Sequence, residues 1–315
     1  MKYYPSYYRD FRCIADKCPD SCCKSWEITI DNDTFDKYQS LQGEIGDRIR
    51  SFICVDDDGD HCFSLIDGRC PFLNEKGLCD IHIAFDENMT GSICREHPRF
   101  IEEYDGFTEI SLSVSCPEAA RLIFSQGACR EVYVTPEYNG DDDVLSVLIA
   151  SRKEILNTNG VLSVLLEKLL LVASRDEEEI NFLSIENICH PSFSDIQNFI
   201  EVLFSECEIL NTDWKKLLIN CNKEAVDSEK LSEFLSNNNN VLANLFYYFV
   251  YRYYLKSVCD LNVFPRGLFI ALSVLSIAVI AYCNSMSVAE VSRLFSKEIE
   301  HSTENVDILI DSLSC

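Results

Sequence analysis

The most constraining feature of this sequence is a dense cysteine motif near its start. Cys13, Cys18, Cys22 and Cys23 lie within eleven residues, and the last two are adjacent. Eleven of the chain's 17 cysteines fall in residues 1–129. The opening residues lack the apolar run of a signal peptide, so we expect a cytoplasmic protein. In that reducing compartment, clustered cysteines bind metal more often than they form disulfides, which remain the alternative.

The cysteines of the first 129 residues provide more thiols than one metal ion needs. Thiolates are soft ligands that suit zinc or iron–sulfur clusters, and each such site takes four of them. We predict a ligand set of eight, which are Cys13, Cys18, Cys22, Cys23, Cys70, Cys79, Cys94 and Cys116. They could form two four-ligand sites, or one site with structural thiols beside it. Both an iron–sulfur cluster, such as the 4Fe-4S type, and zinc stay open. We interpret Cys54, Cys62 and Cys129 as core thiols, and the six later cysteines as core or surface thiols.

Charge and hydropathy limit the partners. The formal net charge of −25 disfavours nucleic acid, which needs a basic face, and would attract a cationic, lysine-bearing protein. The segment 267–283 has no charged residue, but it is shorter than the roughly 20 residues of a membrane-spanning helix. We therefore predict a buried core helix and no membrane association. The oligomeric state stays open.

The element pattern predicts an α+β fold in two parts. The first is a cysteine-rich metal-binding module at 1–129 with a β-hairpin at Asp105-Gly106, and the second is an all-α body at 143–315. We expect residues 1–12 to be extended across the module, because Pro5 opposes a helix. Helices are predicted at 31–41, 44–53, 117–124, 144–157, 161–174, 193–210, 213–221, 241–258, 267–284 and 287–300.

Few other residues in the module suggest chemistry. His82 and His97 could ligate a metal or move protons, although a structural role is the simpler interpretation. Arg95 and Arg99 could bind a carboxylate or neutralise thiolates. The scattered glycines disfavour a Rossmann-type site, and no nucleophile–base pair is evident, so the catalytic and cofactor-binding residues stay unknown.

Several motifs together resemble the flagellin lysine-N-methylase family. They are Tyr4-Pro5-Ser6-Tyr7-Tyr8, the cysteine motif through Trp26-x-Ile28-x-Ile30-Asp31, and the aromatic run 246–256. The segments at Cys70-Pro-Phe-Leu73, Cys79-x-Ile-His82 and Cys94-Arg95 are similar to CxxCxxCC metal-chelating modules, although the spacing here is the looser Cx₄Cx₃CC. The resemblance implies methylation of flagellin lysines, with S-adenosylmethionine as donor and an iron–sulfur cluster on the cysteines. The alternative is a non-catalytic zinc- or iron-binding module on a helical scaffold.

Overall fold

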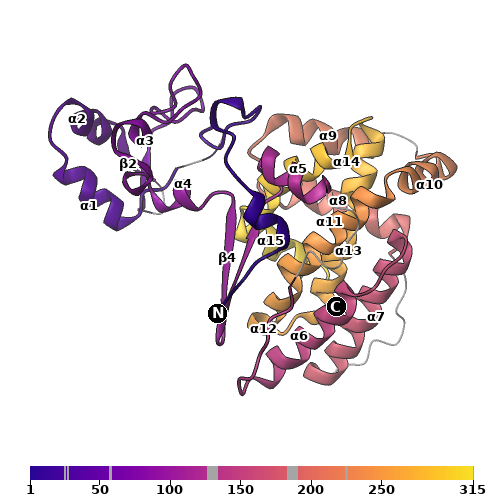
Figure 1. The fold of residues 1–315 in the computed structure, drawn as a ribbon. Helices are drawn as coiled ribbons and strands as arrows, with labels where there is room; N and C mark the ends of the chain where they lie inside the picture. The colour runs from indigo at the N-terminus through magenta and orange to yellow at the C-terminus, as the bar shows by residue number, and fades with distance from the viewer. Residues whose placement is uncertain are drawn as a thin grey trace. The chain divides into compact units, whose positions relative to one another are not determined.

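The computed structural model describes residues 1–24, 26, 28–56, 59–125, 134–182, 191–223 and 226–314. The chain forms two compact units (Figure 1). The cysteine unit comprises Arg12–Phe100 and Cys116–Glu118, and the helical unit comprises Met1–Phe11, Ile101–Ser115 and Ala119–Cys315. The structure is 62% helical with few strands, which is compatible with the predicted α+β class. The predicted division at 1–129 and 143–315 differs from these units, and residues 126–133 lie outside the described part.

The cysteine unit builds a small aromatic core from short elements. Phe63 and Phe72 pack edge to face with ring centroids 4.9 Å apart, beside the fully buried Tyr38. Ile28 and Ile30 lie in the same core. Its elements are η2 Ala15–Lys17, α1 Asn32–Ser40, α2 Glu44–Ser51, β2 Ile53–Val55, β3 His61–Phe63, α3 Asp80–Phe85, η3 Glu87–Met89 and α4 Ser92–Glu96. Burial of these side chains orders loops that have little regular structure of their own.

A three-stranded sheet forms the start of the helical unit. Strands β4 (Arg99–Tyr104) and β5 (Phe107–Leu112) form the hairpin predicted at Asp105-Gly106, and Gly106 takes the positive φ of 76° that the turn requires. Strand β1 (Lys2–Tyr3) pairs in parallel with β5, Lys2 opposite Thr108. The expectation for residues 1–12 is therefore wrong in two respects. Residues 6–10 form the 3₁₀ helix η1 (Ser6–Asp10), and Met1–Phe11 belongs to the helical unit because β1 joins its sheet.

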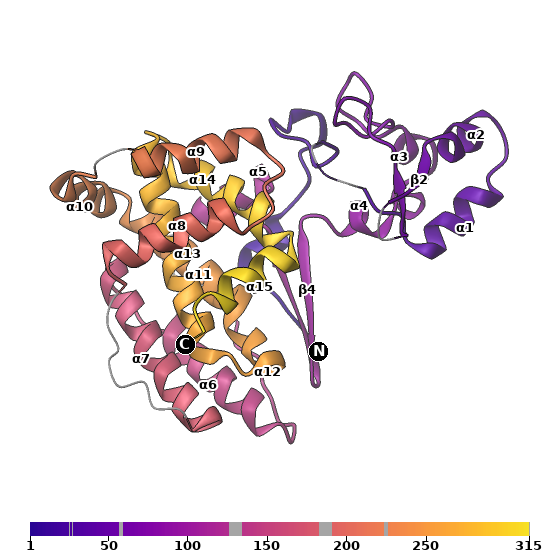
Figure 2. The same cartoon turned by 180° about the vertical axis from the view of Figure 1, so that it is seen from behind.

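The helical unit is organised around α13. This helix, Val263–Cys283, packs against α7, α8, α11 and α14 (Figure 1 and Figure 2). The other elements are α5 Pro117–Ser125, α6 Asp143–Leu156, α7 Leu162–Asn181, α8 Phe193–Ser205, α9 Thr212–Lys223, α10 Ser228–Asn237, α11 Asn239–Tyr253, η5 Tyr254–Lys256, α12 Ser257–Asp260, α14 Val288–Phe295, η6 Ser296–Glu300 and α15 Thr303–Asp311. The predicted helices correspond to observed ones with shifted ends, while α10 and α15 were not predicted.

Helix α13 is the core helix that the sequence predicts. By length and composition it is the one helix of the described residues that could cross a membrane, but 78% of its most apolar window is buried inside the fold. Gly267 permits a close approach to α7, because a Cβ added there would lie 2.8 Å from the Cβ of Ala173. The apolar surface of α13 is thus covered by its own neighbouring helices.

Candidate functional site: the cysteine cluster

The motif at residues 13–23 is a short irregular segment whose last two thiols interact. Cys18 Sγ donates to the carbonyl of Asp20 at 2.8 Å, and the Trp26 indole N–H donates to the carbonyl of Cys22. The ring of Trp26 lies edge to face against His97, with centroids 5.3 Å apart. These contacts fold the chain back on itself and present Cys22 and Cys23 side by side in one turn.

Three later segments bring their cysteines to this motif. The backbone N–H of Cys70 donates to the carbonyl of Cys23 at 2.9 Å. Cys79 forms an isolated bridge with Leu73 and precedes α3, and Cys94 lies in α4. Cys23 and Cys79 pack against the buried aromatic core that includes Cys70. The core of the unit therefore positions thiols that lie far apart in the sequence.

The thiols affect one another electrostatically. A hydrogen bond from the Cys22 thiol lowers the pKa of Cys23 to about 7 and, together with burial, raises the pKa of Cys22 far above its ordinary value. Burial raises the pKa of Cys70 to about 12, and the charges of Cys23 and Cys79 add to that rise. This environment therefore favours the thiolate of Cys23 over the thiolates of Cys22 and Cys70.

Pairwise electrostatic interactions link six of the eight predicted ligands: Cys22 interacts with Cys13, Cys23 and Cys94, and Cys70 interacts with Cys23, Cys79 and Cys94. Cys18 and Cys116 belong to the same unit. None of the fourteen cysteines of the described part forms a disulfide. Within the described ranges no three Cys, His, Asp or Glu side chains are already arranged as a metal-binding group. The donor set suits a thiophilic metal, and the ligand assignment stays a prediction.

Arg95 and Arg99, the two arginines considered near the thiols, donate to backbone carbonyls of their own segment. Arg95 donates to the carbonyl of Thr90. Burial raises the pKa of the Cys94 thiol to about 12, and the charge of Arg95 opposes only part of that rise. Arg99 approaches the carbonyls of Arg95 and Glu96 at 3.4 and 3.5 Å. The two roles considered for Arg95, binding a carboxylate and neutralising thiolates, both stay predictions.

A buried carboxylate in the helical unit was missed by the sequence analysis. Glu300 ends the π-helix η6 and accepts hydrogen bonds from Tyr248 and Tyr253, at 3.0 and 3.1 Å. Burial raises the pKa of Glu300. Nearby, the hydroxyls of Ser113 and Ser115 lie 3.1 and 3.0 Å from Nε2 of His301. The aromatic run 246–256 is almost wholly buried, which supports core packing for these tyrosines.

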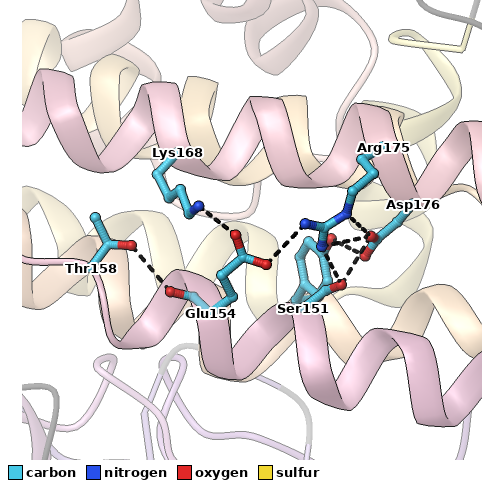
Figure 3. A network of polar contacts seen from close by, with 7 residues as sticks. Ser151, Glu154, Thr158, Lys168, Arg175 and Asp176 are labelled. Atoms are coloured by element: carbon cyan, nitrogen blue, oxygen red, sulfur yellow. Dashed lines mark hydrogen bonds and ion pairs between the residues drawn. The ribbon is translucent and has the colours of Figure 1, made fainter.

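A second polar network joins α6 to α7 (Figure 3). The Glu154 carboxylate accepts from Lys168 and, at 2.9 Å, from Arg175. Ser151 donates to the buried Asp176 at 2.9 Å, and burial raises the pKa of that carboxyl group. Every labelled side chain in this network bonds to a neighbour, so we assign it a structural role.

Comparison with known proteins adds to these observations. The flagellar biosynthetic protein FliU of Salmonella muenchen is 28% identical over 127 residues, which cover 38% of this chain and 75% of that protein. The lysine-N-methylases of Salmonella choleraesuis and Salmonella typhimurium show the same identity over 127 residues, or 32% of their length. The resemblance to the lysine-N-methylase family is confirmed. The match spans about a third of those methylases, and no family model or solved structure matches.

Proposed function

We propose that this protein transfers methyl groups from S-adenosylmethionine to lysine side chains of flagellin. The observation that carries the proposal is the 28% identity to proteins named lysine-N-methylase and to one named for flagellar biosynthesis. The net charge of −25 supports a lysine-bearing substrate, because it attracts cations over a long range, and it disfavours nucleic acid.

We further propose that the predicted cysteines hold an iron–sulfur cluster. The support is that Cys23, Cys70 and Cys79 pack at one aromatic core, and that Cys22 and Cys94 interact electrostatically with Cys23. A bound cluster would supply the positive charge that turns these thiols into thiolates, and it would serve structure or electron transfer. Cys22, Cys23, Cys70, Cys79 and Cys94 are the residues best placed to bind it.

The methyl transfer sets a requirement for the rest of the site. The lysine nitrogen attacks the methyl carbon, the bond from that carbon to sulfur breaks, and S-adenosylhomocysteine leaves. The nitrogen must first lose its proton, and its ordinary pKa is about 10.4, so a base or a desolvating environment is needed. We assign no residue to this role.

A second candidate function is a non-catalytic zinc- or iron-binding module. It is favoured by the position of Cys23, Cys70 and Cys79 against the apolar core, where a metal would act as a structural staple. In that case the helical unit would carry the cysteine unit without any methyl transfer.

Incubation of the anaerobically purified protein with flagellin and methyl-labelled S-adenosylmethionine separates the two candidates. We expect label on flagellin lysines with the unaltered protein and with Cys259→Ala, an exposed cysteine of the helical unit. We expect loss of label with Cys22→Ala. Metal-loaded protein that leaves flagellin unlabelled would favour the structural module.

A further inference from the structure

Two cysteines outside the predicted ligand set face each other across a hairpin. Strands β2 and β3 pair in antiparallel fashion, and Cys54 lies directly opposite Cys62 in their register. Their sulfur atoms are 3.0 Å apart, and the two are not joined by a disulfide. Directly opposed residues have Cα atoms about 4.5–5.5 Å apart, which falls within the range that a disulfide spans. The backbone thus already holds the two thiols in position to be joined.

We propose that Cys54 and Cys62 form a reversible disulfide that acts as a redox switch in the cysteine unit. The oxidant is a low-molecular-weight disulfide such as glutathione disulfide. One protein thiolate attacks a sulfur of the oxidant and forms a mixed disulfide, which releases one glutathione thiol. The second protein thiol then displaces the other glutathione. Two electrons pass to the oxidant, and the two protein protons end on the two glutathione thiols.

The two thiols differ in exposure, and this sets the order of the steps. Cys54 is half-buried, whereas Cys62 is 2% exposed. Glutathione disulfide therefore reacts at Cys54, and Cys62 resolves the mixed disulfide from within the hairpin. If Cys62 reacted with glutathione disulfide first, the hairpin would have to open to expose it.

The hairpin supports the segment that follows the cysteine motif, which gives the switch a structural consequence. The N–H of Ile30 donates to the carbonyl of His61 at 2.7 Å, and the N–H of Phe63 donates to the carbonyl of Ile28 at 3.1 Å. Strand β3 therefore pairs with the chain just beyond Cys22 and Cys23. A disulfide between β2 and β3 would restrict the motion of β3 and so of residues 28–30, which are hydrogen-bonded to it. This effect does not depend on what the cysteine cluster binds.

The sequence provides a direct test of the disulfide. Trypsin cleaves after Arg50 and Arg69, and the peptide 51–69 contains Cys54 and Cys62 as its two cysteines. The peptide 257–266, between Lys256 and the next cleavage site, contains the exposed Cys259 alone and serves as an internal reference. The whole chain is equilibrated with mixtures of reduced and oxidised glutathione, quenched with an alkylating agent, digested and measured by mass spectrometry.

We expect the peptide 51–69 to lose two hydrogens and to take up no alkylating groups. This should occur at roughly a tenfold lower proportion of oxidised glutathione than the mixed disulfide on Cys259 needs, because the second thiol acts at a high effective concentration. Excess reductant should restore two alkylation sites. A Cys62→Ser variant should keep glutathione bound to Cys54. The proposal would be overturned if both cysteines of the peptide 51–69 stayed alkylated. It would also be overturned if each carried its own glutathione at the same proportion of oxidised glutathione that modifies Cys259.

Discussion

The Asp31 carboxylate is the single group whose removal should most clearly loosen the cysteine unit. It caps α1 by accepting from the N–H of Thr34 at 2.9 Å, and it accepts the N–H of Ser92 at 2.7 Å. Ser92 begins α4, the helix that carries Cys94. Asp31→Asn keeps the shape of the side chain but removes its charge and one acceptor. We therefore expect the start of α4 to open more readily in this variant.

The pKa of Asp31 gives the size of this effect. Burial opposes ionisation, but the hydrogen bonds from Ser92 and Thr34 outweigh it and lower the pKa from 3.8 to about 2. At about 1.4 kcal/mol for each pH unit, that difference corresponds to about 2.5 kcal/mol as an upper bound. The carboxylate keeps partial contact with solvent, so we discount the value to about 1 kcal/mol, in line with measured helix caps.

The pH dependence follows from the lowered pKa. The stabilisation is fully present above pH 3.8, the unfolded value, and is lost as the pH falls through about 2. The difference between the unaltered protein and Asp31→Asn should therefore be constant at neutral pH, shrink as the pH falls from 3.8 to about 2, and vanish below pH 2. Urea titrations at several pH values, read by pulsed hydrogen exchange at the peptide spanning residues 92–97, measure it.

Asp33→Asn is the matched control, because Asp33 is an exposed carboxylate in the first turn of the same helix. At neutral pH, Asp31→Asn should speed exchange of the Ser92 amide about fivefold, which corresponds to about 1 kcal/mol. The control should change it much less. Equal effects of the two variants, or an undiminished difference at pH 2, would refute the assigned role of Asp31.

Three further predictions concern the helical unit. Gly267→Ala should lower the stability of the helical unit by about 1–3 kcal/mol in thermal unfolding, because the new Cβ clashes with Ala173. If adding Ala173→Gly failed to restore the stability, the clash would be contradicted. Arg152→Met should lower the free energy of unfolding by about 3–5 kcal/mol, because it leaves Glu109 buried and unpaired. The double variant Arg152→Met, Glu109→Leu should recover most of that loss in calorimetry. Ser192→Ala removes the capping box of α8 and should cost about 1 kcal/mol in urea unfolding, and an unchanged midpoint would be inconsistent with that cap.

Elements with a strong local signal could be predicted from the sequence. The turn residues Asp105 and Gly106 placed the hairpin, and the unbroken apolar run placed α13. Helix α10 spans ten residues and has no buried residue, so its three apolar side chains, Leu231, Phe234 and Leu235, form a periodic signal too short to be noticed. The 3₁₀ helix at Ser6–Asp10 follows Pro5, which ends the extended segment rather than continuing it.

The candidate site could be predicted only in part. Cysteine density led to a predicted ligand set, of which Cys23, Cys70 and Cys79 lie at one core. The thiol pair of Cys54 and Cys62 depends on strand register, which their spacing alone did not fix. The cluster at Glu300 arises where η6 meets α11, about fifty residues away in sequence, so no local pattern indicates it. Tertiary packing decides both features.

Metal analysis of the protein purified without oxygen tests the cysteine site most directly. We predict iron and inorganic sulfide in stoichiometric amounts with visible charge-transfer absorption, lost in Cys22→Ala and Cys70→Ala and retained in Cys259→Ala. Stoichiometric zinc in a colourless protein would contradict the cluster while keeping a metal site. Protein without any metal, or metal retained in both Cys22→Ala and Cys70→Ala, would contradict the site itself.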